Sequence, residues 1–152
     1  MKNLKSKKAF TMIELVFVIV VIGILASVAI PRFSATRDDA EVTKAKVLVA
    51  SIRNALSMER QKRILRGDFT PITSVGTSNN AFDVFSPDKD GNRKNVLDYS
   101  VPSSTDKGKW DFNITTTNEY TFHMLGNVAF NISSGRFVCV DENSTGCKTL
   151  TN

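Results

Sequence analysis

Few residues of this chain could perform acid–base, nucleophilic or zinc chemistry. The 152 residues include a single histidine, His123, and two cysteines, Cys139 and Cys147. A nucleophilic site needs a base within hydrogen-bond reach, and a structural zinc site needs four cysteine or histidine ligands. One histidine completes neither arrangement, and we expect His123 to lie on the surface. We therefore predict no catalytic residues and disfavour an enzyme.

One stretch has the spacing of oxygen ligands for calcium. Asp88, Asp90 and Asn92 stand at alternate positions, as the first ligands of calcium loops do. The stretch is not an EF-hand, because Arg93 takes the position of the tight-turn glycine and Tyr99 that of the bidentate glutamate. Two interpretations stay open: a polar β-turn, which we favour, and a weak calcium site formed by Asp88, Asp90 and Asn92.

Three asparagines stand in the N-x-[ST] sequence of N-glycosylation acceptors: Asn113, Asn131 and Asn143. An acidic residue precedes two of them by two positions, Asp111 before Asn113 and Asp141 before Asn143. That longer pattern resembles the acceptor site of bacterial N-oligosaccharyltransferases, which makes Asn113 and Asn143 candidate glycosylation sites. The alternative, which the sequence alone favours, is a chance match in a chain rich in Asn and Thr.

The positive charge of the chain is concentrated at its N-terminus. The formal net charge is +5, but residues 1–9 hold four lysines and no acid. Residues 68–152 are mildly acidic, with seven Lys or Arg against ten Asp or Glu. A cluster of basic residues ends the central part of the chain: Arg60, Lys62, Arg63 and Arg66. Such a cluster could contact DNA phosphates, but we expect a solvated helix end and disfavour direct DNA binding.

Residues 10–30 form an apolar run that is interrupted only by Thr11, Glu14, Gly23 and Ser27. Twenty-one helical residues span about 30 Å, the thickness of the hydrocarbon core of a membrane. The lysines before the run keep that end in the cytoplasm, so the rest of the chain is expected on the other side. No A-x-A-like cleavage site ends the run, as one would in a secretory signal. We therefore predict a retained single-pass anchor in contact with membrane lipids.

A long amphipathic helix is predicted to continue beyond the anchor. Pro31 predicts a kink or local melting or, in a simpler interpretation, a helix end at the membrane surface. Residues 32–66 contain neither Gly nor Pro, and Gly67 is placed to cap their end. Apolar residues recur there along one helical stripe: Ala45, Val49, Ile52 and Leu56. We predict one helix over residues 10–66, with residues 10–31 as its transmembrane part and 32–67 as its amphipathic part.

The remaining residues, 68–152, are predicted to form a β-sheet head. Residues 68–108 hold three prolines and many small polar residues, which predicts an ordered connector with one short strand or helical turn. Beyond it, apolar and polar residues alternate in four runs separated by turn-type residues: 110–114, 120–124, 128–132 and 137–140. This pattern predicts an antiparallel sheet of about four strands whose apolar face the helical stripe covers. The predicted fold class is α+β.

The segment KKAFTMIELVFVIVVIGILASVAIPRF resembles the N-terminus of type IV pilins and type II secretion pseudopilins, and is nearest to a G-type major pseudopilin. In that family a prepilin peptidase cuts before a phenylalanine and methylates the new N-terminus. A glutamate follows at the fifth mature position and a proline at the twenty-second. Counting Phe10 as the first residue, Glu14 and Pro31 match both. The resemblance implies cleavage between Ala9 and Phe10, although the family usually has glycine where Ala9 stands, and N-methylation of Phe10 after loss of the leader 1–9.

The carboxylate of Glu14 needs a partner if its helix crosses a membrane. An acidic residue within a span costs about 2.5–3.5 kcal/mol on insertion scales. Once the leader is removed, no Lys or Arg of the same helix is within reach, which leaves the α-amine of Phe10 on this or a neighbouring subunit. The resemblance favours the neighbour, with Glu14 setting the register of helices packed in a filament and Pro31 letting them pack and stretch. The alternative is a plain anchor whose Glu14 reaches the headgroups.

The resemblance implies a pilin fold and a structural role. We expect a subunit of a type II secretion or DNA-uptake pseudopilus, a homo-oligomeric helical filament anchored in the bacterial inner membrane with its heads in the periplasm. The implied partners are minor pseudopilins, the prepilin peptidase and an inner-membrane assembly platform with its ATPase. The alternatives are a surface type IV pilin for adhesion or twitching motility and, less favoured, a membrane-tethered enzyme.

Two features of the head favour opposite subclasses. A head of 85 residues favours the pseudopilin. A disulfide between Cys139 and Cys147, which the oxidising space outside the membrane permits, resembles the C-terminal disulfide region of many type IV pilins. The other interpretation of the two cysteines is a pair of free thiols. No cofactor is expected apart from calcium at the weak site.

Overall fold

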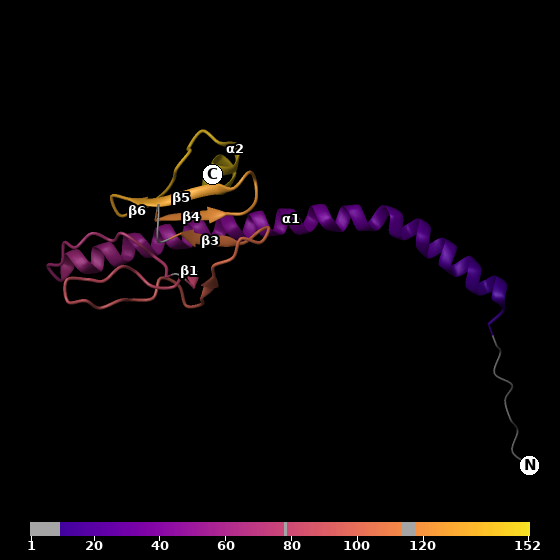
Figure 1. The fold of residues 1–152 in the computed structure, drawn as a ribbon, viewed down its shortest axis with the longest axis horizontal. Coiled ribbons are helices and arrows are strands. Elements are labelled where there is room, and N and C mark those ends of the chain that lie inside the picture. Colours follow the sequence, from indigo (N-terminus) through magenta and orange to yellow (C-terminus); the bar gives the residue numbers. More distant parts are fainter. Residues whose placement is uncertain (1–9, 78, 114–117) are drawn as a thin grey trace, which may run out of the picture. The chain divides into compact units, whose positions relative to one another are not determined.

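The computed structural model describes residues 10–77, 79–113 and 118–152, and the chain divides into two compact units, Met1–Asp39 and Ala40–Asn152. Helix α1 spans Met12–Leu65 and contributes to both units (Figure 1). Its ends lie within two residues of the predicted ones, and the long N-terminal helix is confirmed. The helix is unbroken at Pro31, so local melting at this proline is not seen in the described chain.

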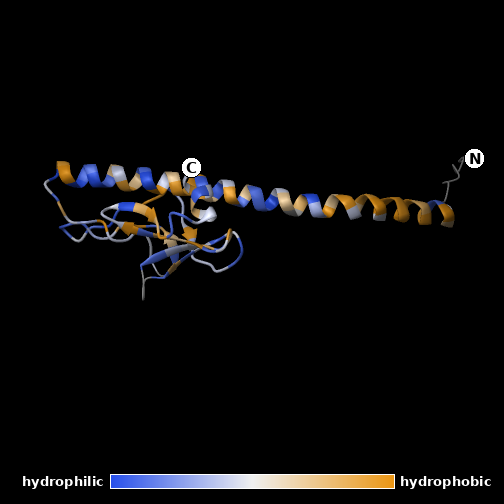
Figure 2. Cartoon of the chain, turned by 90° about the horizontal axis from the view of Figure 1, so that it is seen from above, coloured by the Kyte–Doolittle hydropathy of each residue, from blue (hydrophilic) through white to orange (hydrophobic). Residues whose placement is uncertain are grey.

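Residues 12–31 of α1, within the first unit, are apolar on nearly all sides, and Figure 2 shows this N-terminal stretch of the helix in the hydrophobic colour over several consecutive turns. None of its most apolar window is buried, and by length and composition the helix can cross a membrane. In the second unit the colours alternate, as expected for a helix with one buried stripe. The apolar stripe predicted from the sequence is the buried side of this part of the helix, since Val49, Ile52 and Leu56 expose 1% or less of their surface.

The C-terminal end of α1 closes on Gly67. Gly67 has a φ of +70°, a conformation that glycine adopts without steric cost. Its amide donates to the carbonyl of Ile64 at 2.9 Å, and the amide of Asp68 donates to the carbonyl of Arg63 at 2.8 Å. These two bonds form a Schellman motif, which satisfies carbonyls that the helix leaves unpaired. The predicted role of Gly67 as a helix cap is confirmed.

Four strands form an antiparallel sheet in the order β3-β4-β5-β6, as predicted. They span Trp110–Asn113, Glu119–Phe122, Val128–Ser133 and Arg136–Cys139. Phe122 pairs with Trp110 on one side and with Val128 on the other, so their side chains lie on the same face. This face is buried, and buried and less buried residues alternate along β3 and β4. The α+β fold class is therefore confirmed.

The core of the second unit lies between the α1 stripe and this sheet. Seven aromatic residues from the sheet and the connector pack ring against ring there: Phe82, Trp110, Phe112, Tyr120, Phe122, Phe130 and Phe137. Two arginines of α1 also reach the end of the sheet, where Arg53 donates to the carbonyl of Phe137 at 3.1 Å and Arg60 to that of Ser134 at 3.0 Å. Helix and sheet of this unit are thus joined by apolar packing and by hydrogen bonds.

The connector is more structured than the sequence predicts. It forms two short strands, β1 at Asn80–Phe82 and β2 at Val101–Pro102, which pair antiparallel in a second sheet. Its apolar side chains join the core, and Phe82 and Val75 are completely buried. The buried hydroxyl of Tyr120 accepts the amide of Val75 at 2.8 Å, which fixes the connector to the main sheet. One expected short strand is in fact one half of a strand pair.

A second helix, α2 at Thr145–Thr151, was not predicted. Ser144 is its N-cap, and the Ser144 hydroxyl accepts the amide of Cys147 at 3.2 Å. Gly146 lies so close to the β4–β5 turn that an added Cβ would meet the side chain of Val128 and lie 2.8 Å from the carbonyl of Leu125. Leu150 completes the packing at 1% exposure. The segment after β6 therefore ends in a short helix docked on the core.

Candidate functional site

The N-terminus of α1 is closed by a capping box made of Thr11 and Glu14. The Glu14 Oε2 accepts the backbone amide of Thr11 at 2.9 Å and its hydroxyl at 2.8 Å. The amide of Glu14 in turn lies 3.3 Å from the Thr11 hydroxyl oxygen, which accepts it. Two donors that the first turn would leave unpaired are thereby satisfied. Both residues belong to the chain that remains after the predicted cleavage.

Thr11 was not predicted as a partner of Glu14, because only charged groups were expected to pair with the carboxylate. The signal was present, since T-x-x-E before an apolar run is the sequence pattern of a capping box. Thr11 is neutral, so these hydrogen bonds hold the carboxylate in place without cancelling its charge. A negative charge in the first turn is favourable for the helix, whose N-terminus carries partial positive charge. The arrangement therefore presents a fixed anion at the beginning of the apolar segment.

The apolar surface around this anion is unusually exposed for a folded chain. Phe10 exposes 78% of its surface, Met12 84% and Ile13 74%. Side chains farther along are open too, and Leu25 and Ile30 expose 65% and 68%. Exposed apolar surface of this extent marks a region that lipid or other protein covers. Pro31 is also exposed. Ala9, the residue before the predicted cleavage point, lies outside the described residues.

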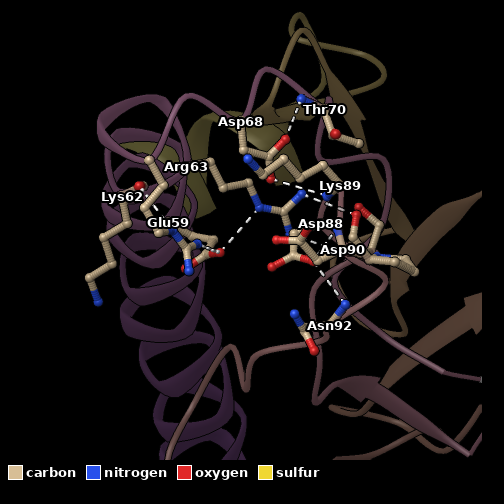
Figure 3. Close-up of polar contacts among 12 residues, drawn as sticks. Glu59, Lys62, Arg63, Asp68, Thr70, Asp88, Lys89, Asp90 and Asn92 are labelled. Carbon is tan, nitrogen blue, oxygen red and sulfur yellow. Dashed lines mark hydrogen bonds and ion pairs between the residues drawn. The ribbon is translucent and has the colours of Figure 1, made fainter.

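A second polar site lies at the far end of α1, where the side chain of Arg63 is buried (Figure 3). Its Nε donates to Glu59 Oε1 at 3.1 Å, its Nη2 to the carbonyl of Ser86 at 2.6 Å and its Nη1 to that of Pro87 at 3.3 Å. Arg63 exposes 1% of its surface and Glu59 4%. Arg66 lies 3.6 Å from the same Oε1 atom and is half exposed. The buried ion pair thus ties the end of α1 to the connector.

These contacts correct the expectation of a solvated basic helix end. Arg63 is buried because the connector covers this face of α1, and Arg60 is bound to the turn between β5 and β6. The i,i+4 spacing of Glu59 and Arg63 predicts an ion pair, but no local pattern predicts that Ser86 and Pro87 enclose it. The side chains of three of the four basic residues, Arg60, Arg63 and Arg66, therefore make contacts within the protein.

Asp68 and Asp88, both buried, fold their carboxylates onto backbone amides beside this ion pair (Figure 3). Asp68 accepts the amides of Thr70 at 2.9 Å and Lys89 at 3.2 Å. The hydroxyl and the amide of Thr70 lower the pKa of Asp68 to about 2, with further contributions from the Lys89 amide and the Arg63 charge. The amide of Asn92 is the main cause that lowers the pKa of Asp88. Both carboxylates are therefore held in the charged form.

The expected calcium ligands lie in this second site. Asp88 Oδ1 accepts the amides of Asp90 at 3.0 Å and Asn92 at 2.8 Å, the pattern of a polar turn closed by an aspartate. Asp90 and Asn92 are exposed. A calcium ion would have to compete with both amides for the Asp88 carboxylate. Within the described residues, no group of three or more His, Cys, Asp or Glu is placed to hold a metal ion. Calcium binding at Asp88, Asp90 and Asn92 stays a prediction.

The other predicted site residues are separate from these two sites. Cys139 at the end of β6 is joined to Cys147 in α2, with their Cα atoms 6.2 Å apart. Asn113 and Asn143 are exposed, while Asn131 is half-buried. His123 is also half-buried, contrary to the surface position expected. Its Nε2 is shielded and has no hydrogen-bond partner among the described residues.

Comparison with known proteins adds a family match at the N-terminus. Residues 4–30 match the family model of the prokaryotic N-terminal methylation motif. This stretch includes Thr11, Glu14 and most of the exposed apolar surface. It ends just before Pro31.

Curated relatives are also similar over the N-terminal region of the chain. Type II secretion system core protein G of Vibrio cholerae is 34% identical over 58 residues, which are 38% of this chain and 40% of that protein. The type IV narrow pilus major component of Thermus thermophilus is 43% identical over 51 residues, 34% of this chain and 44% of that protein. A fimbrial protein of Pseudomonas aeruginosa is 40% identical over 52 residues, 34% of either chain.

The match spans less than half of each of these relatives, and the β-sheet head lies largely beyond it. No solved structure matches the chain. The N-terminal region thus carries the prokaryotic N-terminal methylation motif and is similar to type II secretion protein G and to type IV pilins, as its motif predicted.

Proposed function

We propose that this chain is a pilin-like structural subunit that is processed at its N-terminus and polymerises through the apolar half of α1. One observation carries the proposal: the methylation motif coincides with a helix whose apolar surface is open all round. Such a surface is stable only when lipid or other apolar helices cover it. A membrane covers it before assembly, and the helices of neighbouring subunits cover it in a filament.

Glu14 gives this assembly its register. The capping box holds the Glu14 carboxylate at the start of the helix, and cleavage between Ala9 and Phe10 creates a cationic amine one residue before Thr11. In an apolar environment two opposite charges attract strongly, and a mismatched charge is costly. Neighbouring helices therefore gain most when the Phe10 amine of one subunit meets the Glu14 carboxylate of another. N-methylation of Phe10 keeps this charge and makes the amine less hydrated.

The filament class that we favour is the pseudopilus of a type II secretion or DNA-uptake machine. The head is small, and Vibrio cholerae core protein G is among the similar proteins. The subunit would sit in the inner membrane as a single-pass protein with its head in the periplasm. There it would polymerise with copies of itself and with minor pseudopilins on an assembly platform driven by an ATPase. The prepilin peptidase would act on the cytoplasmic side.

A surface type IV pilus for adhesion or twitching motility is the second candidate. The Cys139–Cys147 disulfide favours it, because it closes the C-terminal region of the head onto the end of the sheet. Pilus and fimbrial subunits are also among the similar proteins. We propose no enzymatic activity.

Mass spectrometry of the full chain tests the proposal. The chain extracted from membranes of a strain with an active prepilin peptidase should begin at Phe10 and carry one methyl group on its α-amine. Recovery of only the full-length chain from such a strain would contradict the proposal. A strain that lacks the peptidase provides the control and should retain residues 1–9.

Shearing of cells separates the two filament classes. Abundant filaments released into the medium indicate a surface pilus. Filaments that stay within the cell envelope, together with loss of secreted enzymes or of transformation when the gene is deleted, indicate a pseudopilus. A processed chain that forms no filament in either fraction would refute the structural role.

A further inference from the structure

The structure separates the three asparagines that carry an N-glycosylation acceptor sequence. Asn131 lies within β5, opposite Val138 of β6, and its Oδ1 is buried without a hydrogen-bond partner among the described residues. The acceptor sequence of Asn113 continues into residues 114–117, which the structure does not describe. Asn143 is the one of the three whose side chain is exposed and whose whole acceptor sequence is described.

We propose that Asn143 is an N-glycosylation site, with Asp141 and Thr145 as the residues that make it an acceptor. The proposal rests on the proposed function for one point, the position of the head on the outer side of the membrane. It goes beyond that function, because nothing in filament assembly requires a modified head. The ligand class is an oligosaccharide carried on a lipid pyrophosphate, transferred by a membrane oligosaccharyltransferase.

The local geometry makes Asn143 available to an enzyme. The last ladder bond of β6 runs from the amide of Val140 to the carbonyl of Ala129, so the acceptor segment begins where the sheet ends. The turn that follows is held by its own residues. Asp141 Oδ1 accepts the amide of Asn143 at 3.1 Å, and the Ser144 hydroxyl donates to the carbonyl of Asp141 at 2.9 Å.

Presenting Asn143 to an enzyme therefore breaks these turn contacts and the N-cap bond from the Cys147 amide to the Ser144 hydroxyl, and the buried Gly146 and Cys147 of α2 need not move. Asn131 differs, because presenting it would break the pairing of β5 with both of its neighbours. The Cys139–Cys147 disulfide also limits how far the opened segment can move from the sheet. The acceptor segment can thus open while the core keeps its packing.

Three residues of the segment have a chemical role in the transfer. The side-chain nitrogen of Asn143 forms a bond with the anomeric carbon of the lipid-linked sugar as the bond from that carbon to the pyrophosphate oxygen breaks. The lipid pyrophosphate leaves with the bonding electrons, and the amide proton passes to a carboxylate of the enzyme. The exposed Thr145 offers the hydroxyl that the acceptor sequence requires. The exposed Asp141 offers a negative charge that a basic residue of the enzyme can pair with.

A glycan at Asn143 would also constrain the filament. An oligosaccharide is strongly hydrated, and burying it between two packed heads would leave its hydroxyl groups without partners. The turn between β6 and α2 would therefore face solvent in the assembled filament, and the contacts between heads would use other surfaces.

The test uses the full chain expressed in a bacterium with an oligosaccharyltransferase that recognises D/E-x-N-x-S/T and with its lipid-linked oligosaccharide. Peptide mapping of the membrane-extracted protein should find the oligosaccharide on Asn143. Asn143→Gln and Thr145→Val should each abolish it there, and Thr145→Ser should retain it. Asp141→Asn keeps the oxygen that holds the turn but loses the charge, and should reduce the modified fraction. Asn131→Gln is the matched control and should leave the glycosylated fraction at Asn143 unchanged.

The result that overturns the proposal is an unmodified Asn143 peptide from cells that glycosylate a control acceptor protein. The mass of the N-terminal peptide in the same sample reports separately on the proposed function. A chain that begins at methylated Phe10 but has an unmodified Asn143 refutes the glycosylation site and leaves the filament proposal standing. If the host also has an active prepilin peptidase, a chain that keeps residues 1–9 counts against the filament proposal instead.

Discussion

Replacing Arg63 with methionine should destabilise the head more than any other change of a single charged residue at the end of α1. Methionine keeps much of the apolar stem but removes the guanidinium. Glu59 would then be buried with only Arg66 nearby, at 3.6 Å and half exposed. The carbonyls of Ser86 and Pro87 would lose their donor as well.

The expected loss follows from these contacts. Removing one member of a buried ion pair costs about 3–5 kcal/mol, and a buried acceptor left without a donor costs about 1–3 kcal/mol. Arg66 can move closer to Glu59 and recover part of the loss. We therefore expect the free energy of unfolding to fall by about 3–4 kcal/mol, a large part of the stability of a small domain.

Urea unfolding of the compact unit Ala40–Asn152 measures this effect. The only tryptophan, Trp110, exposes 3% of its surface, so its fluorescence reports on loss of the core. Arg66→Met is the matched control, since it removes a half-exposed partner of the same carboxylate and should cost less than about 1 kcal/mol. Arg63→Lys should lie between the two, because one ammonium cannot reproduce the planar fork.

A double variant tests the reasoning further. Glu59→Gln combined with Arg63→Met leaves no buried charge unpaired at this pair and should be more stable than Arg63→Met alone. Equal midpoints for Arg63→Met and Arg66→Met would refute the role assigned to the buried pair. So would a double variant that is less stable than the single one.

Three other predictions concern the pH dependence, the disulfide and Glu14. The lowered pKa of Asp68, about 2 against about 3.9 in an unfolded chain, stabilises the head fully above about pH 4 and progressively less as the pH falls toward 2. Asp68→Asn should flatten the change of urea midpoint between pH 4 and pH 2.5, and an unchanged slope would contradict the assignment. Replacing both Cys139 and Cys147 with serine opens a short loop and should lower the unfolding free energy by about 2–3 kcal/mol, as measured by urea unfolding under non-reducing conditions. No loss of stability would show that the disulfide does not constrain the head. Glu14→Ala should insert in the membrane and be processed normally but form no filament in sheared or envelope fractions, with Glu14→Asp intermediate, and normal filaments from Glu14→Ala would refute the register mechanism.

Sequence patterns predicted the parts of the fold that depend on periodicity. The stripe from Ala45 to Leu56 and the alternation in residues 110–140 identify a helix face and a sheet face that can bury each other, and the structure pairs them. The connector was harder because its two strands are two and three residues long, too short for a period to appear. Helix α2 has an N-cap signal at Ser144, but Gly146 and three threonines in seven residues give it low helix propensity. Tertiary packing of Cys147 and Leu150 decides its structure.

The candidate site was predictable where it depends on neighbouring residues and not where it depends on distant ones. Thr11 and Glu14 are three positions apart, and their capping box is a sequence pattern. Arg63 meets Ser86 and Pro87, which lie more than twenty positions away. Its burial follows from the path of the connector, and no local pattern encodes that path. The stretch that begins at Asp88 matched a metal-ligand pattern because polar residues at alternate positions occur both in turns closed by an aspartate and in calcium loops.

The capping box is compatible with the proposed role of Glu14 both in the single subunit and in a filament. Thr11 supplies two neutral donors to Oε2, which satisfies the helix terminus but leaves the negative charge of the carboxylate intact. In the membrane that charge carries an energetic cost, which a neighbouring Phe10 amine can remove. A carboxylate has acceptor positions beyond those that Thr11 uses, so the amine can bind while the capping box stays closed. Association then gains the attraction of the charges without first unwinding the helix start. The same anion that orders the helix in the single subunit would therefore favour its addition to a filament.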